Sequence, residues 1–332
     1  MTRGFFFKSL RILNINYLLQ RNEANRLHVL LFHRINDYNH KFYPAMPVKV
    51  FDRVCDFFSR RFNIITFSEI GDYFKKTRRP AAIISFDDGF YDVLENAYPI
   101  LAKYRLRFNI NVVTESMETG LPQDNIRVYD VLNATDNKEY INTEISSKPL
   151  RIFIDRDSPS KTELEFVRLF QGLGKEQRRL VADDIVNKLA VAPVKFSRML
   201  SADDIKYLHK KGAEIGSHTH SHAILSNLDM SEVEFELAHS KKALEGLCGR
   251  TIDIIAYPDG KYNEAIIRAS QESGYKYMLL CENSVNVIKN ADENRFSRVN
   301  LHHNTLDENL AKIFGFHKII YSIKAFLWYR KV

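Results

Sequence analysis

The sequence predicts an α/β protein whose strands and helices alternate around a barrel-like sheet. Short apolar segments, which suit buried strands, alternate along the chain with longer segments of helical apolar spacing, giving roughly eight strands. Histidines, aspartates and an arginine fall near the predicted strand ends. Because the chemistry of α/β barrels lies at the carboxyl ends of the strands, we expect these polar side chains to share one site.

The first part of the chain follows the alternation closely. We expect a strand at 27–32, a helix at 50–62, strands at 63–67 and 81–86, a helix at 91–104 and a strand at 108–113. Pro99 is expected to kink the second of these helices, because proline has no backbone N–H. His33 follows the first strand, and Asp87 and Asp88 follow the strand at 81–86.

Residues 114–197 fit the alternation poorly. The part from 121 to 157 has no clear apolar period and is rich in Asn, Asp, Ser and Thr. Two helices are expected at 161–171 and 175–190, on either side of a Gly-Leu-Gly turn. This organisation predicts an insertion that caps the site and does not form an independent domain.

The alternation returns after the insertion. We expect helices at 202–211, 231–249 and 265–273, and strands at 214–217, 252–257, 277–280 and 297–301. Ser201 is suited to cap the first of these helices and Gly212 to end it. Ser231 and Glu234 have the spacing of a capping box for the second.

Length and charge predict a large body with basic ends. The 332 residues, 45% of them hydrophobic, are enough for one large domain or two ordinary ones. The net charge of +7 lies entirely in residues 1–26 and 306–332. A nucleic-acid enzyme would carry its basic groove near the active site, so the neutral middle argues against a nucleic-acid partner. We expect a basic extension at 1–26, a barrel at 27–305 with an insertion at about 114–197, and a basic amphipathic helix at 306–332.

The sequence also suggests a location. No apolar run approaches the ~18 residues of a membrane span, and Lys8 and Arg11 interrupt the apolar segment near the N-terminus. Three dispersed cysteines suit a reducing compartment. We therefore expect an unprocessed, cytoplasmic protein. The helix expected at 306–332 could lie on an anionic membrane surface, or it could pack its apolar face on the body of the protein.

Two stretches carry the candidate chemistry. A buried strand delivers Asp87 and Asp88 to one rim of the sheet, and adjacent residues of an extended chain point to opposite sides. One carboxylate could then bind a metal while the other handles a proton. His218 and His222 are four residues apart and would share one face of a helical turn, with His220 facing elsewhere. Two histidines and a carboxylate are a standard open ligand set for a catalytic divalent metal. The alternatives are an ordinary Asp-Gly turn and a solvated histidine-rich loop.

Three motifs are shared with a known family. They are Ser-Phe-Asp-Asp-Gly at 85–89, His-Thr-x-x-His at 218–222 and Tyr-Pro-x-Gly at 257–260. In order and spacing they resemble the polysaccharide deacetylases, the NodB-homology or carbohydrate esterase type four family, and the resemblance covers about 27–302. It implies a distorted, TIM-like (β/α)7 barrel that removes acetyl groups from sugar polymers with a divalent metal, often zinc. It also implies an N-acetylated sugar or glycan as the substrate.

The resemblance implies roles for individual residues. The metal ligands would be Asp88, His218 and His222. Zinc is the expected metal, with cobalt, nickel or manganese as alternatives, and Asp87 would be the general base. Leu-Phe-His-Arg at 31–34 resembles a circularly permuted branch that contains the poly-N-acetylglucosamine deacetylases, in which this histidine is the general acid. His33 would then protonate the leaving amine.

The sequence departs from the family pattern at two motifs. The family's Arg-x-Pro-Tyr is Ala-Tyr-Pro-Asp at 256–259, so the arginine that would steady the base is missing, and the tryptophan of the fourth motif is also absent. Arg298 is a candidate replacement, with an ordinary strand-end salt bridge as the alternative. Tyr257, Pro258 and Asp259 would still contact the substrate, and the backbone N–H of Asp259 could hold a tetrahedral oxyanion.

These observations together predict a metal-dependent sugar N-deacetylase that is cytoplasmic or apposed to a membrane. Its expected substrate is an acetamido sugar in a surface polysaccharide or in a lipid-linked glycan precursor. Two alternatives stay open. One is a hydrolase of a small non-peptide amide on the same fold, and the other is a carbohydrate-binding protein that has lost catalysis.

Overall fold

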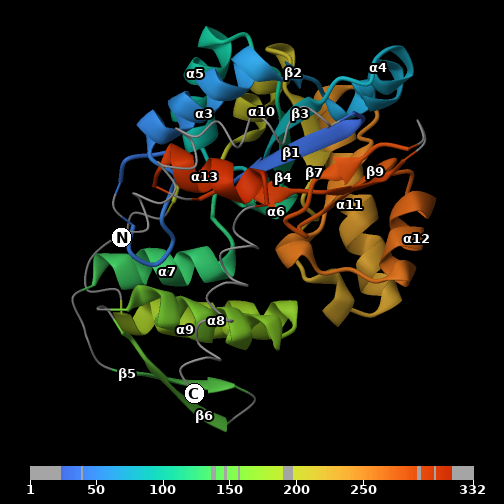
Figure 1. The fold of residues 1–332 in the computed structure, drawn as a ribbon. Helices are drawn as coiled ribbons and strands as arrows, with labels where there is room; N and C mark the ends of the chain where they lie inside the picture. The colour runs from blue at the N-terminus through green and yellow to red at the C-terminus, as the bar shows by residue number, and fades with distance from the viewer. Residues whose placement is uncertain are drawn as a thin grey trace, which may run out of the picture.

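A mostly parallel sheet of ten strands curls into a nearly closed barrel (Figure 1). The computed structural model describes residues 24–315, except 39, 136–139, 146–147, 156–157, 190–196, 290–292 and 303. The strands of this sheet are β1 (Arg26–Phe32), β2 (Asn63–Ile64), β3 (Ala81–Phe86), β4 (Asn109–Val112), β7 (Glu214–Ser217), β8 (Ile254–Ala256), β9 (Tyr277–Leu280), β10 (Asn286–Val287), β11 (Arg295–Ser297) and β12 (Val299–Asn300).

The barrel closes through one short stretch of chain near its carboxyl end. The hydrogen-bonded order runs β1–β3–β4–β7–β8–β9–β11, and β12 then pairs in parallel with β1, with Leu30 opposite Val299. Arg298 is the single residue between β11 and β12, so it lies where the circuit closes. The predicted barrel-like α/β fold is confirmed.

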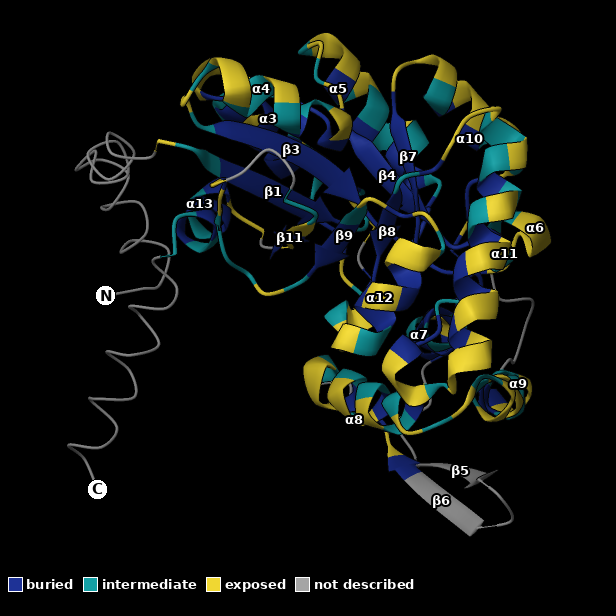
Figure 2. Ribbon diagram, turned by 90° about the vertical axis from the view of Figure 1, so that its right-hand side faces the viewer, coloured by how far each residue is buried: buried dark blue, intermediate teal, exposed yellow. Residues whose placement is uncertain are grey.

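Apolar strands and amphipathic helices explain this arrangement. Every residue of β3 is buried, as expected for a parallel strand covered on both faces. Figure 2 shows the strands buried and the outer faces of the surrounding helices exposed. These helices are α3 (Val48–Arg61), α4 (Ile70–Lys76), α5 (Tyr98–Lys103), α6 (Thr114–Thr119), α10 (Ala202–Lys210), α11 (Met230–Cys248), α12 (Glu264–Glu272) and α13 (Leu306–Ile313).

A second group of elements lies beside one end of the barrel (Figures 1 and 2). It consists of α7 (Asp124–Ala134), α8 (Pro159–Gln171), α9 (Lys175–Leu189) and the antiparallel hairpin of β5 (Tyr140–Ile145) and β6 (Lys148–Phe153). The three helices share a second hydrophobic cluster, which includes Tyr129, Phe166 and Ile185 and which Phe42 and Phe90 join from segments outside these helices. We call these three helices the helical cap.

The cap differs in part from the sequence prediction. Helices α8 and α9 lie where two helices are predicted, but α7 and the hairpin occupy 121–157, where no period is recognisable. Helix α6, at the start of the predicted insertion, packs against α11 of the barrel and not against the cap alone. Asn, Asp and Thr in and around α7 hide its apolar face from a simple periodicity search.

Two local predictions need correction. The capping box of α11 is formed by Asp229 and Glu232, not by Ser231 and Glu234, and Ser231 donates its hydroxyl proton to Asp229. The helix predicted at 91–104 is a π-helical segment followed by α5, and Pro99 lies in the first turn of α5. Proline is tolerated there because the first-turn N–H groups have no partner within a helix.

The ends of the chain are described only in part. Residues 1–23 and 316–332 lie outside the described residues, so the predicted basic extension and most of the predicted C-terminal helix are not tested. Helix α13 is described, and it buries Leu306, Leu310 and Ile313 in the main core beside α3. Within the described ranges, no helix combines the length and the apolar character needed to cross a membrane.

Candidate active site

A cavity of about 510 Å³ lies between the carboxyl ends of the barrel strands and the helical cap. Of the nine residues predicted for the site, eight line it: His33, Asp87, Asp88, His218, His222, Tyr257, Asp259 and Arg298. Pro258 is buried in the turn between Tyr257 and Asp259 and does not line the cavity. The topology therefore brings residues from strand ends far apart in the sequence to one place, as the sequence predicts.

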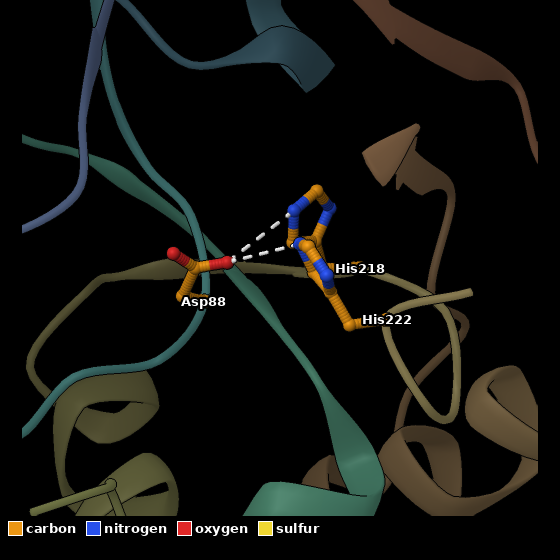
Figure 3. Close-up of side chains that lie close together, drawn as sticks. All are labelled: Asp88, His218 and His222. Atoms are coloured by element: carbon orange, nitrogen blue, oxygen red, sulfur yellow. Dashed lines mark ion pairs between the residues drawn. The ribbon is translucent and has the colours of Figure 1, made fainter. Parts of the chain in front are cut away.

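Asp88, His218 and His222 form a cluster with the spacing of metal ligands (Figure 3). Oδ1 of Asp88 lies 3.6 Å from Nε2 of His218 and 3.4 Å from Nε2 of His222. Ligands of a tetrahedral zinc ion with bonds of about 2.0–2.1 Å are about 3.3 Å apart. The three donor atoms therefore fit a divalent metal with little rearrangement.

The histidines are brought together by a loop and not by a helical turn. Residues 218–222 follow β7 as irregular chain, and Thr219 and His222 have positive φ angles of 65° and 55°. The two imidazole rings nevertheless lie 4.9 Å apart. The prediction of a helical turn at 218–222 is therefore wrong, although the two histidine side chains do lie together as predicted.

Glu236 of α11 fixes this loop. Its buried carboxylate accepts hydrogen bonds from the backbone N–H groups of His220 and Ser221, both at 2.8 Å, and from the Ser221 hydroxyl at 2.5 Å. Charge-assisted bonds of this kind are the stronger ones in proteins. They hold the backbone between the two candidate ligands His218 and His222.

Further contacts orient the candidate ligands. Nδ1 of His218 lies 2.8 Å from the backbone carbonyl oxygen of Ala256, which leaves Nε2 facing Asp88. The Tyr43 hydroxyl donates to Oδ2 of Asp88 at 3.3 Å. Burial, with the nearby His218 and Arg178, holds the pKa of His222 well below its usual value, so its imidazole is neutral and can bind a metal.

Asp87 lies beside this cluster with one oxygen held and the other facing the histidines. Its Oδ1 accepts hydrogen bonds from Arg298 at 2.7 Å and from Asn111 at 2.8 Å, while Oδ2 lies 3.8 Å from Nε2 of His218. Burial raises the pKa of Asp87, but the charges of Arg298 and His218 outweigh it, and the pKa falls below its usual range.

The two aspartates do not point to opposite sides, as strand geometry predicted. Strand β3 ends at Phe86, and Asp88 has a φ angle of 71°, which turns its side chain into the same cavity as that of Asp87. The two aspartates differ instead in their surroundings, which shift their pKa values in opposite directions. The guanidinium of Arg298 stabilises the charge of Asp87, whereas burial, with Asp87 nearby, raises the pKa of Asp88.

A buried polar chain supports Asp87 from inside the barrel. The Ser85 hydroxyl donates to Oδ1 of Asn109, and the Asn109 amide donates to Oδ1 of Asn111, whose own amide reaches Asp87. A Cβ atom at Gly216 would overlap Oδ1 of Asn111. Because Gly216 of β7 has no side chain, Asn111 has the space that it occupies beside this strand.

The polar side chains of the Tyr-Pro-Asp turn after β8 are engaged with neighbouring helices, so the turn offers the cavity mainly its backbone groups. The Tyr257 hydroxyl donates to Oγ of Ser270 at 2.9 Å, away from the cavity, so its phenol is engaged with α12. Asp259 has a φ angle of 53°, and its carboxylate accepts a hydrogen bond from Gln171 of α8 at 3.1 Å. This bond joins the barrel to the helical cap at the edge of the cavity.

Several residues in and around the site are absent from the sequence prediction, among them Asn111, Tyr43 and Gln123. Asn111 had a detectable signal, because it and Asn109 are amides within an otherwise apolar strand. Tyr43 and Gln123 had none, since they lie in irregular segments. Gln123 is only 8% exposed and lines the cavity, and neither atom of its amide has a hydrogen-bond partner within the described part of the chain.

Comparison with known sequences identifies relatives of this chain. The sequence profile of the family described as polysaccharide deacetylase matches residues 74–278. YxkH of Bacillus subtilis, whose name describes it as a polysaccharide deacetylase, is 34% identical over 77 residues, 23% of this chain and 28% of YxkH. Peptidoglycan-N-acetylglucosamine deacetylase of Bacillus cereus is 31% identical over 75 residues, 23% of this chain and 35% of that protein. The chain thus aligns with about a third of the length of these relatives.

Solved structures share the fold. The deacetylase PplD of Streptococcus pyogenes, in complex with acetate, superposes with a TM-score of 0.58 and 16% identity, over 88% of this chain and 99% of that one. IcaB from Ammonifex degensii superposes with a TM-score of 0.54 and 16% identity, over 88% and 98% of the two chains. With a family match over most of the barrel and the same fold in solved deacetylases, this chain belongs to the polysaccharide deacetylase family.

Proposed function

We propose that the protein is a metal-dependent N-deacetylase that acts on an acetamido sugar. One observation carries the proposal. Three side chains with the spacing of metal ligands line the same cavity as Asp87. Asp87 is ionised and is held by Arg298. The match to the polysaccharide deacetylase family supports the same activity.

Asp88, His218 and His222 are the residues that would hold the metal. Their donor atoms lie within 4.8 Å of one another, and their chemistry of two imidazoles and one carboxylate suits zinc, with cobalt, nickel or manganese as alternatives. When bound, the metal supplies an activated water and polarises the acetyl carbonyl. Asp88 and His218 are both buried in the wall of the cavity.

Asp87 is the proposed general base. Arg298 and Asn111 engage Oδ1, so Oδ2 is the oxygen that can accept a proton from the attacking water. Because Arg298 keeps Asp87 ionised, the base is ready to accept this proton at neutral pH. In this role Arg298 replaces the arginine missing from the 256–259 motif, and the bond to Asp87 supports that assignment.

His33 is the proposed general acid. It follows β1 and lines the cavity, and imidazole is the side chain whose ordinary pKa allows proton donation near neutral pH. It would protonate the amine nitrogen as the carbon–nitrogen bond breaks, while Asp87 keeps the proton taken from water. The backbone N–H of Asp259 would donate to the carbonyl oxygen as negative charge develops there.

The cavity suits a short sugar substrate. Tyr43, Gln123, Tyr129 and Glu163 supply aromatic faces and hydrogen-bonding groups from the segments that cover the barrel end. We infer that an acetamido sugar at the end of a polysaccharide, or in a lipid-linked glycan precursor, is the substrate. A cytoplasmic location and contact of the basic ends with a membrane remain predictions, because those ends lie mostly outside the described residues.

A second candidate function uses the same site. The walls contributed by α7 and α8 close the cavity on the side away from the barrel, which would also suit a small non-peptide amide. Acetate release from N-acetylated monosaccharides and N-acetylglucosamine oligomers, measured beside the ring opening of cyclic ureides, would separate the two. Ring opening of the ureides without acetate release from any sugar would overturn the sugar proposal.

The test combines metal content with acetate release. Wild type, Asp87→Asn and His218→Ala are compared on N-acetylglucosamine oligomers with added zinc or cobalt. We expect the wild type to release acetate, Asp87→Asn to keep the metal of this site but lose at least about 10²-fold in rate, and His218→Ala to lose the metal held by Asp88, His218 and His222. A wild type that binds metal and sugar but releases nothing from any N-acetylated sugar would instead indicate a carbohydrate-binding protein.

A further inference from the structure

A second cluster of metal-ligand chemistry lies outside the cavity, on the other side of the loop that carries the candidate active-site histidines. It consists of Glu118 from α6, His220 from the loop and His239 from α11, and its donor atoms lie within 4.8 Å of one another. We propose that these residues form a second metal site, which takes a zinc ion that joins α6, α11 and the loop 218–222.

His220 is prepared for this role by its surroundings. It is only 9% exposed, and its Nδ1 lies 2.9 Å from the hydroxyl oxygen of Thr114 at the start of α6. In the tautomer whose Nδ1–H donates to the Thr114 hydroxyl, the lone pair of Nε2 is available to a metal. The same kind of bond to a protein oxygen orients His218, and metal-binding histidines commonly have one.

The backbone around His220 is equally constrained. Glu236 accepts from its N–H, and its carbonyl oxygen accepts a hydrogen bond at 2.8 Å from the backbone N–H of Glu115. The imidazole is therefore held from two sides, by α6 and by α11. A site whose central ligand is fixed in advance loses little conformational entropy when the metal binds.

The other two ligands complete the set from exposed positions. The rings of His220 and His239 lie 4.2 Å apart, and Phe235 packs against both. Glu118 and His239 are exposed, and the side chain of neither makes a hydrogen bond or an ion pair within the described ranges. The neighbouring Glu115 is already paired with Lys175 and Arg179 of α9, so Glu118 is the carboxylate that α6 can offer.

The ligand chemistry indicates the metal. Two imidazoles and one carboxylate suit zinc, with water in the fourth position. Bound there, the ion would join α6, α11 and the loop 218–222 by direct bonds. Because that loop also carries His218 and His222, the second site would stiffen the backbone that supplies both histidines of the first.

The experiment is a count of bound metal in the full chain. Apo-protein is titrated with zinc and with cobalt, and bound metal is measured by elemental analysis and by the visible absorption of cobalt. We expect two ions in the wild type, one in Asp88→Asn, which lacks a ligand of the first site, and one in His239→Ala. The double variant is expected to bind none.

Matched variants make the outcome decisive. His209→Ala removes a histidine of α10 outside the cluster and is expected to keep two ions. Glu118→Gln is expected to weaken the second site at least tenfold, as loss of a ligand should. One ion in the wild type, or an unchanged count in His239→Ala, would overturn the second site. Neither result would bear on the proposed deacetylase, which is tested by acetate release.

Discussion

Nη1 of Arg298 lies 2.7 Å from Oδ1 of Asp87, and both side chains are almost fully buried although 211 residues separate them in the sequence. Nε of the same guanidinium donates to the carbonyl oxygen of Leu280 at 3.1 Å. The two bonds fix the orientation of the guanidinium and hold Nη1 against Oδ1 of Asp87.

Replacement of Arg298 by lysine is therefore expected to impair catalysis. A lysine ammonium lacks the planar fork and cannot bind Asp87 and Leu280 in the same geometry. We expect Arg298→Lys to reduce the rate of acetate release about 10–100-fold while metal content stays unchanged. Arg295→Lys is the matched control, because Arg295 lies three residues away and pairs with Glu264 at the surface. Equal activity of both variants would contradict the proposed role of Arg298.

The close approach at Gly216 leads to a second prediction. Gly216→Ala would place a methyl group against Asn111 and Ile254, and Asn111 could move only by weakening its bond to Asp87. We expect a loss of about 1–3 kcal/mol in the free energy of unfolding and about a 10-fold or greater fall in the rate. Gly246→Ala, in an open position on α11, is expected to leave the rate unchanged and to stabilise the helix by up to about 1 kcal/mol. Denaturant unfolding and acetate release measure the two effects.

Gln123 should separate stability from substrate binding. Its buried amide has no partner within the described residues, so Gln123→Leu is expected to raise the free energy of unfolding by about 1–2 kcal/mol. If the amide binds the sugar, the same variant should raise KM severalfold and leave metal content unchanged. Gln271→Leu, at an exposed position of α12, is the control. An unchanged KM would exclude Gln123 from substrate binding.

Asp92 predicts a pH dependence of stability. Burial, opposed by Arg34 and Asn36, raises the pKa of Asp92 from an ordinary value near 3.8 to about 6. Between these values the folded chain binds more protons than the unfolded chain, so this contribution to stability is complete below about pH 4 and is lost as the pH rises through about 6. The loss amounts to about 3 kcal/mol. Denaturant titrations from pH 4 to 7 measure the free energy of unfolding, which should fall with rising pH in the wild type and lack this fall in Asp92→Asn. The same pH dependence in both proteins would show that Asp92 is not responsible.

The sequence predicts the barrel and the cavity residues because both depend on local patterns. Buried strands such as β3 are almost wholly apolar, and the residues that follow them reach the same edge of the sheet whatever the details of the connecting loops. This is why Asp87, His218 and Arg298 could be assigned to one site before their contacts were known.

The remaining features depend on tertiary contacts that leave no local pattern. The pairing of Arg298 with Asp87, and not with a surface carboxylate, follows from the closure of the sheet. The loop of His218 and His222 is irregular because Glu236 and α6 hold its backbone, and spacing alone cannot distinguish this from a helical turn. Helix α7 is stabilised mainly by its burial against α8 and α9, which its own composition does not reveal.

The position of Arg298 between β11 and β12 has a consequence for the protein during its synthesis on the ribosome. β1 is among the first described segments to be made, but its parallel partner β12 is among the last. Until residues 295–300 have emerged and paired, the barrel is open and Asp87 lacks its guanidinium partner. The nascent chain can therefore contain all three candidate metal ligands before the proposed base has its partner, and the proposed activity would begin only when the barrel has closed.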